Sequence, residues 1–470
     1  IGASLIAANI SAEQIIGMSG SGYAIGLAIA SYEWMAAFTL LLVGKFVLPI
    51  FLKTGIYTMP QFLEQRYDRR VKTVMAVFWL GVYTFVNLTS ILWLGALAIN
   101  TVAGADLSLG LACLGIFAVA YSLYGGLKAV ALTDIIQVIL LVMGGLMISW
   151  ILLDQIAAGA GPIAGFTALT QHAPDKFHTI LNKGHPHYMS IPGLSVLFGG
   201  MWVMNLSYWG FNQYIIQRAL AAKSVDEAQK GIVFAALLKL LMPVIVVLPG
   251  IAMFVLNPGL AAPDKAYPSA MNLLPLGIKG LVFAALLAAI VSSLASMCNS
   301  ISTIFTVDVA PSLGMESDGG QRSVTLGRIV AIAAMIIAML TARPLLGNFE
   351  QAFQYIQEFT GFFTPGIVAI FMLGLFWSRT TATAALISAI TSAVLSLLLK
   401  VYWPDLPFMD RVGLVFLLCV AVGVVWSILR PRAQAGFVDP AGVSFSTTQG
   451  FNVSAVVVTL ILIFFYTAWW

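Results

Sequence analysis

The N-terminal part of this sequence reads Ala7-Ala8-Asn9-Ile10-Ser11-Ala12-Glu13-Gln14, a polar cluster within an apolar segment long enough to cross a bilayer. Unpaired backbone groups and charges are costly inside lipid, so polar residues at this depth need a cavity lined by protein. A second polar cluster interrupts a later apolar segment, and it contains Asn205, Ser207, Asn212 and Gln213. Two interrupted helices at matching places in two halves indicate the binding site of a transporter.

The composition supports a membrane-embedded chain. Hydrophobic residues make up 60% of the 470 positions, charged residues 9%, and the mean hydropathy is +0.96. These values lie outside the range of soluble domains, and they predict an all-α polytopic membrane protein. The net charge of +4 gives no indication of a nucleic-acid partner. Three cysteines lie in separate apolar segments, as buried core residues do.

Apolar windows of about 20 residues predict thirteen membrane spans. They cover residues 1–24, 25–52, 72–102, 108–124, 129–153, 193–218, 230–256, 276–308, 324–342, 350–377, 381–403, 412–430 and 451–470. Most of the 23 lysine and arginine residues lie in every second loop, which places those loops in the cytoplasm. We expect a multi-pass membrane protein, with an N-terminal part preceding Ile1.

The spans group into two related blocks. We expect a first five-helix repeat at 1–153, an extracytoplasmic loop at 154–192, a second repeat at 193–377 and three further helices at 378–470. An odd number of spans per block inverts the second copy, so a five-plus-five inverted-repeat transporter fold with broken first and sixth helices is predicted. All four histidines lie in the loop at 154–192, and their spacing matches no metal-ligand motif, which favours a solvated loop.

Glu33 and Lys239 are ionisable residues flanked by apolar runs. Charges at such depth usually face the bundle interior and pair with each other. One interpretation is a structural ion pair between two helices. The other is a polar wall for a neutral, hydroxyl-rich solute, because each hydroxyl is both donor and acceptor and suits carboxylate, amide and ammonium groups together.

Aromatic and hydroxyl residues extend this pattern. Tyr208 follows Asn205 within the second polar cluster, and a ring there could stack on the apolar face of a pyranose or simply pack between helices. Ser292 and Ser293 form a pair of hydroxyls that could bond to the backbone of their own helix or bind sodium, a hard cation that takes oxygen ligands. Asp134 is a further site for a cation or a proton.

Several motifs resemble those of a known family. The run from Tyr124 to Asp134, YGGLKAVALTD, is similar to a signature of the sodium:solute symporter family. Asn9–Gln14, Trp209–Arg218 and Ala352–Glu358 resemble its sugar-transporting branch, and within it the bacterial sodium/galactose transporters. The resemblance covers nearly the whole chain. It implies fourteen helices, one of them before the thirteen predicted here.

The resemblance also implies roles for individual residues. The sugar site would comprise Gln14, Glu33, Asn87, Asn205, Lys239 and Gln357, with Asn9 and Tyr32 close by. Tyr208 would be the inner gate, and the outer cover would be Met18, Tyr83 and Phe353. Sodium would bind the carbonyls of Ala7, Ile10 and Ala289 and the hydroxyls of Ser292 and Ser293, with Asp134 on its exit route. Ala36 stands where the sugar-transporting branch has a sugar-contacting serine, which leaves the preferred epimer open.

The expected function is therefore sodium-coupled uptake of a galactose- or glucose-like sugar by alternating access, with Na+ as the coupling ion. Alternatives are another polar solute, such as inositol, an amino acid or sialic acid, and a solute sensor. A channel would need a continuous polar lining, and the predicted spans contain no histidine for enzyme chemistry, so neither is expected. The expected partners are a small sugar, sodium and the lipid bilayer, and the oligomeric state is open between monomer and dimer.

Overall fold

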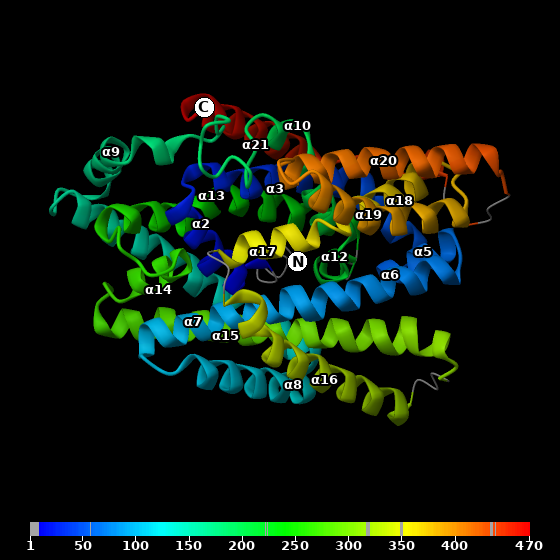
Figure 1. Cartoon of the computed structure of the whole chain (residues 1–470), viewed down its shortest axis with the longest axis horizontal. Helices are drawn as coiled ribbons and strands as arrows, with labels where there is room; N and C mark the ends of the chain where they lie inside the picture. Colours follow the sequence, from blue (N-terminus) through cyan, green and yellow to red (C-terminus); the bar gives the residue numbers. More distant parts are fainter. Residues whose placement is uncertain are drawn as a thin grey trace.

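The computed structural model describes residues 9–56, 58–220, 222, 224–315, 320–347, 351–432, 436–437 and 439–470, without the side chains of 124–135, 217 and 440. Within these residues every regular element is a helix (Figure 1). Nine of the described helices are long and apolar enough to cross a membrane, or ten when one bent pair is counted as a span. The prediction of an all-α polytopic membrane protein is confirmed.

The helices of the N-terminal part run up to the long loop that follows α8. They are η1 (Glu13–Gly17), α2 (Met18–Ala24), η2 (Leu27–Ala30), α3 (Ser31–Leu42), η3 (Val43–Val47), α4 (Leu48–Thr54), α5 (Met59–Arg66), α6 (Arg69–Val82), η4 (Tyr83–Leu88), α7 (Thr89–Ala103) and α8 (Leu107–Ile156). The loop itself carries α9 (Pro162–His172) and η5 (Pro174–Phe177).

The remaining helices follow from residue 195 to the C-terminus. They are α10 (Ser195–Phe198), α11 (Gly200–Leu206), η6 (Ser207–Phe211), α12 (Gln213–Leu220), α13 (Val225–Leu256), η7 (Pro263–Lys265), α14 (Ala266–Met271), α15 (Leu276–Thr303), η8 (Ile304–Val309), η9 (Ala310–Leu313), α16 (Gln321–Leu346), α17 (Ala352–Thr360), α18 (Thr364–Phe376), α19 (Ala382–Tyr402), α20 (Phe408–Leu429), η10 (Pro440–Gly442) and α21 (Gln449–Ala468). Helices α19 and α20 pack against α18, and α21 packs against α3 and α13.

Both predicted helix breaks are present. Ile10 and Ser11 lie outside helical geometry, and the chain then continues through η1 into α2. At the second break η6 ends at Asn212, which is extended with φ −87° and ψ 119°. The Asn212 side-chain oxygen accepts the backbone N–H of Tyr214 at 3.0 Å, so this residue caps the next helix, as asparagine commonly does.

Some span predictions change in detail. Windows 1–24 and 193–218 contain the breaks, so neither forms one continuous span helix among the described residues. Windows 108–124 and 129–153 lie in the single helix α8, where Ile136–Ile156 alone meets the span criterion. Window 350–377 is a pair of helices, α17 and α18, bent by 47°. Pro365 at the start of α18 explains the bend, because proline suits the first turn of a helix and cannot continue a preceding one.

Helices α2 and α13 pack at very short range, beside α3 (Figure 1). A Cβ atom added to Gly250 of α13 would lie 2.1 Å from the Ser19 carbonyl oxygen, and one added to Gly22 of α2 would lie 2.6 Å from the Val247 carbonyl oxygen. Glycine at both positions lets the two backbones touch, as small residues do at helix interfaces in membranes. This contact fixes the first helix against the helix that carries Lys239.

We predict that Gly250→Val destabilises the protein by about 1–3 kcal/mol, because the added methyl groups must push α13 away from the α2 backbone. The measurement is thermal unfolding of purified protein in detergent, with Gly259→Val as control, since a Cβ atom at Gly259 meets nothing within 4 Å. Equal melting temperatures for Gly250→Val and the wild type would contradict the close packing.

Candidate functional site

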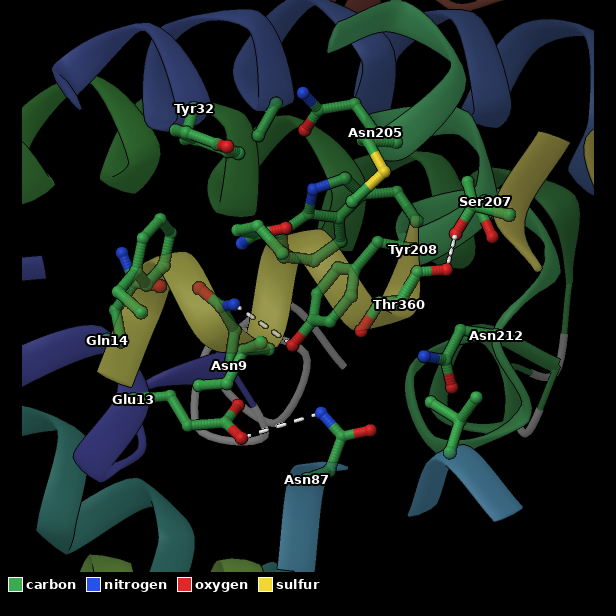
Figure 2. A pocket seen from close by; sticks show the side chains of 18 of the residues that line it. Asn9, Glu13, Gln14, Tyr32, Asn87, Asn205, Ser207, Tyr208, Asn212 and Thr360 are labelled. Carbon is green, nitrogen blue, oxygen red and sulfur yellow. Dashed lines mark hydrogen bonds between the residues drawn. The ribbon is translucent and has the colours of Figure 1, made fainter. Parts of the chain in front are cut away.

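A cavity of about 110 Å³ lies between the two broken helices and their neighbours (Figure 2). All eight residues predicted for the sugar site line it: Asn9, Gln14, Tyr32, Glu33, Asn87, Asn205, Lys239 and Gln357. The four predicted gate residues also line it: Met18, Tyr83, Tyr208 and Phe353. The structure therefore brings together residues that lie far apart in the sequence, and their roles toward a sugar remain predictions.

A buried ion pair forms one wall of the cavity. The Lys239 ammonium group, with its side chain 1% exposed, lies 2.6 Å from Glu33 Oε2 and also donates to Asn9 Oδ1. It lies 5.0 Å from the centre of the Trp209 ring as well, in a cation–π contact. A buried charge pair is tolerated when further hydrogen bonds complete it, and here the amide of Asn9 and the ring of Trp209 do so.

Three cavity walls are π-helical turns. Gln14 lies in η1, Tyr83 and Asn87 lie in η4, and Tyr208 lies in η6. Such turns are rare within α-helices and frequent at functional sites, because the wider turn changes the direction in which side chains point. The sequence contains no clear signal for them.

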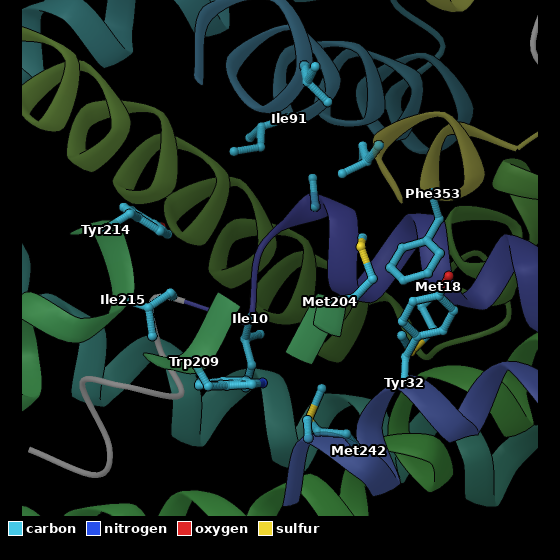
Figure 3. Packing of buried hydrophobic residues seen from close by; sticks show 14 of the residues in the cluster. Ile10, Met18, Tyr32, Ile91, Met204, Trp209, Tyr214, Ile215, Met242 and Phe353 are labelled. Atoms are coloured by element: carbon cyan, nitrogen blue, oxygen red, sulfur yellow. The ribbon is translucent and has the colours of Figure 1, made fainter. Parts of the chain in front are cut away.

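The cavity has an aromatic end and a polar end. The rings of Tyr32 and Phe353 meet edge to face with centroids 5.1 Å apart, beside Met18 (Figure 3). At the polar end Tyr208 accepts a hydrogen bond from Asn9 Nδ2 at 3.1 Å, and Tyr83, predicted to belong to the same cover as Met18 and Phe353, donates to Asn212 Oδ1 at 2.6 Å. Met18 and Phe353 are buried, so the aromatic end is closed.

The residues predicted to bind sodium lie on two elements. Ile10 is buried at the first break, and Ala289, Ser292 and Ser293 are buried on α15. Ala7 lies outside the described residues, and so does the side chain of Asp134. The ligand set and the exit route therefore stay predictions.

The structure adds cavity residues that the sequence reasoning did not assign to the site. They are Ser11, Glu13, Ser207, Trp209, Asn212 and Thr360. Glu13 is the most informative, because its carboxylate accepts a bond from Asn87 Nδ2 at 3.4 Å within the cavity (Figure 2). Its position beside Gln14 in the first polar cluster was a signal that could have identified it.

A second carboxyl group that the sequence reasoning missed holds the start of α17, next to Phe353. Asp264 in η7 is buried, and its Oδ2 accepts the backbone N–H of Ala352 at the start of α17, at 2.8 Å. A Cβ atom on Gly20 would lie 2.3 Å from Asp264 Oδ1, so this loop contacts the α2 backbone directly. Burial raises the pKa of Asp264 to about 7, and the bond from Ala352 offsets part of that increase.

A sequence model of the sodium:solute symporter family matches residues 1–392. The chain belongs to the sodium:solute symporter family. The predicted family resemblance is confirmed, and the position of the cavity at two broken helices agrees with the sites of such symporters.

Several members of the symporter family are similar over most of their length. A sodium/glucose cotransporter of Vibrio parahaemolyticus is 51% identical over 492 residues, covering 100% of this chain and 90% of that protein. The uncharacterized symporter YidK of Escherichia coli is 32% identical, covering 99% and 83%. Human sodium/glucose cotransporter 4 is 33% identical, covering 86% of this chain and 64% of the human protein.

Solved structures agree on the fold of the symporter. A Na+-coupled sialic acid symporter in a substrate-bound outward-open state has a TM-score of 0.78 and 25% identity, covering 93% of this chain and 90% of that one. The nucleobase-cation symporter Mhp1 has a TM-score of 0.57 and 14% identity, covering 97% and 95%. The five-plus-five inverted-repeat fold is confirmed.

We predict that Asp264→Asn is more heat-stable than the wild type at pH 8 and that the difference shrinks toward pH 4.5. The raised pKa means that the buried carboxyl group destabilises the folded protein when it is ionised. This destabilisation is complete above about pH 7, and it decreases as the pH falls toward the ordinary pKa of 3.8. The measurement is thermal unfolding of both proteins at the two pH values. A stability difference that does not change with pH would contradict a buried ionisable Asp264.

Proposed function

We propose that this protein is a sodium-coupled sugar symporter of the bacterial inner membrane that works by alternating access. One observation carries the proposal: a polar cavity at two helix breaks combines an amino group, two carboxyl groups and six amides, which suits a solute with many hydroxyls. The 51% identity to a Vibrio sodium/glucose cotransporter supports the same conclusion.

The charges in the cavity favour a neutral solute. Lys239 is the sole basic side chain among the described residues of the lining, and Glu33 neutralises it at 2.6 Å. A carboxylated solute such as an amino acid or sialic acid would need a free cation there. The small Ala36 in the lining offers no hydroxyl, so inositol and the different sugar epimers must be distinguished by experiment.

The proposed mechanism couples the two broken elements. Sodium bound by carbonyls near Ile10 and hydroxyls of α15 would hold the first helix in its outward-open form. Sugar binding would let Phe353 and Tyr32 close, and loss of sodium to the cytoplasm would free the first helix and open the Tyr208 side. Residues 1–153 and 193–377 would be the two repeats, with 154–192 outside and 378–470 as additional helices.

The free energy released when one sodium ion enters the cell is sufficient to drive sugar uptake. One charge crossing 100 mV releases about 2.3 kcal/mol, and a tenfold sodium gradient adds about 1.4 kcal/mol. The sum would maintain a sugar gradient of roughly 500-fold when one sodium moves with each sugar. The direct test is uptake of a panel of labelled sugars into proteoliposomes with and without an inward sodium gradient, and sodium-independent entry of every sugar would reject the proposal.

We predict that Gln14→Ala and Lys239→Ala each abolish sugar uptake in proteoliposomes while the protein still elutes as a folded species. Each change removes hydrogen-bonding groups that line the cavity. Asn452→Ala is the matched control, because this exposed amide lies on α21 away from the cavity lining. Normal uptake by both cavity variants would refute the proposed sugar site.

We also predict that Ser293→Ala raises the half-saturating sodium concentration for uptake at least about tenfold, which corresponds to about 1.4 kcal/mol of lost ion binding. Ser300→Ala is the control, because Ser300 lies on the same helix and its hydroxyl donates to the backbone carbonyl of Ser296. An unchanged sodium dependence in Ser293→Ala would remove this hydroxyl from the ligand set.

A further inference from the structure

The carboxylate of Glu13 faces the cavity without a basic partner. Among the residues that the structure describes, its hydrogen bond comes from the neutral amide of Asn87 at 3.4 Å, and no lysine, arginine or histidine lies within ion-pair distance. Lys239 is already bonded to Glu33 and Asn9. The acidic and basic side chains among the described residues of the lining are therefore Glu13, Glu33 and Lys239, and Lys239 is paired with Glu33.

An ionised Glu13 needs compensation of its charge at this depth. An unpaired carboxylate amid membrane helices is costly, and a neutral sugar brings no positive charge with it. The sodium ligands proposed on Ile10 and α15 are carbonyl and hydroxyl oxygens, which also carry no full negative charge. Glu13 is thus the nearest group in sequence to the first break that can balance a bound cation.

A small second cavity adjoins Glu13 on the side of the helix breaks. Its volume is about 10 Å³, which is at the lower limit for holding a single water molecule. Oxygen-bearing side chains from three segments line it: Ser11, Glu13, Asn87, Tyr208, Asn212 and Tyr214. Carboxylate, amide and hydroxyl oxygens are the ligands that hard cations such as sodium prefer.

Asn87 is suited to both an empty and an occupied site. In this structure its Nδ2 group faces Glu13, which is the favourable arrangement for a bare carboxylate (Figure 2). Half a turn of the amide would direct its carbonyl oxygen to the same point and so complete a ligand pair around a cation. A basic residue at position 87 would instead fill the site permanently.

We propose that Glu13 and Asn87 form a sodium-binding position beside the sugar cavity, which sodium occupies before it reaches the ligands at Ile10, Ser292 and Ser293. The proposal rests on the proposed sodium-coupled function and deepens it. The same single ion visits two positions in turn, so the number of sodium ions moved per sugar does not change. An ionised Glu13 draws sodium into the cavity, and the ion then moves on to the second position.

The test is equilibrium binding of radioactive sodium to the purified full chain without sugar, at constant ionic strength. We expect Glu13→Gln to weaken sodium binding at least tenfold and Glu13→Asp to restore part of it. Asn87→Asp should strengthen sodium binding, because it adds a second charged ligand. Asp226→Asn, an exposed carboxylate outside the cavity lining, is the control and should bind sodium like the wild type.

The outcomes separate this site from the proposed function. If the sodium affinity of Glu13→Gln stays within twofold of the wild type, the proposed position at Glu13 is overturned. If in the same experiments Ser293→Ala weakens sodium binding, the symport proposal still stands. Unchanged sodium binding together with a loss of pH dependence in Glu13→Gln would mean that the position takes a proton, and this also overturns the proposal. Failure of the wild type to bind sodium at all would reject the proposed function itself.

Discussion

The bonds between Lys239, Glu33 and Asn9 join three segments in the middle of an apolar bundle. Lys239 lies on α13, Glu33 on the first turn of α3, and Asn9 beside the first helix break. Because breaking one partner of a buried pair costs about 3–5 kcal/mol, the three segments are held in one arrangement. This arrangement of the three segments keeps the polar side chains of the cavity lining away from lipid and close to one another.

Other features of the fold serve the same arrangement. The glycine contacts between α2 and α13 allow the first helix to lie against the lysine helix at backbone distance. The π-turns then direct Gln14, Asn87 and Tyr208 toward the space that is left. The break at Asn212 separates η6 from α12, so Tyr208 and the residues after the break lie on different helices.

The fold class and many of the cavity residues could be predicted from the sequence, because polar residues are rare in membrane-spanning segments and stand out there. Asn9, Glu33, Asn205 and Lys239 stand in apolar runs, and each of them lines the cavity. Composition and span length were sufficient for the fold class. The family motifs, rather than spacing, supplied the roles of Met18, Phe353 and Gln357.

The remainder depends on tertiary contacts that local patterns do not encode. The partner of Glu13 is Asn87, and the two meet because η4 is a π-turn rather than an α-turn. Asp264 reads as an ordinary loop acid, and it is buried because Gly20 allows η7 to touch α2. Apolar length likewise could not reveal that α8 continues through the segment between two predicted spans.

The most direct test of the account measures thermodynamic coupling between the two proposed ligands. Binding of labelled galactose or glucose to the purified protein should be determined at zero sodium and at saturating sodium, with ionic strength held constant. Coupling must be reciprocal, so the account predicts that sodium raises sugar affinity at least about tenfold and that sugar raises sodium affinity by the same factor. Equal sugar affinity in both conditions would contradict the claim that one cavity couples a sugar to sodium.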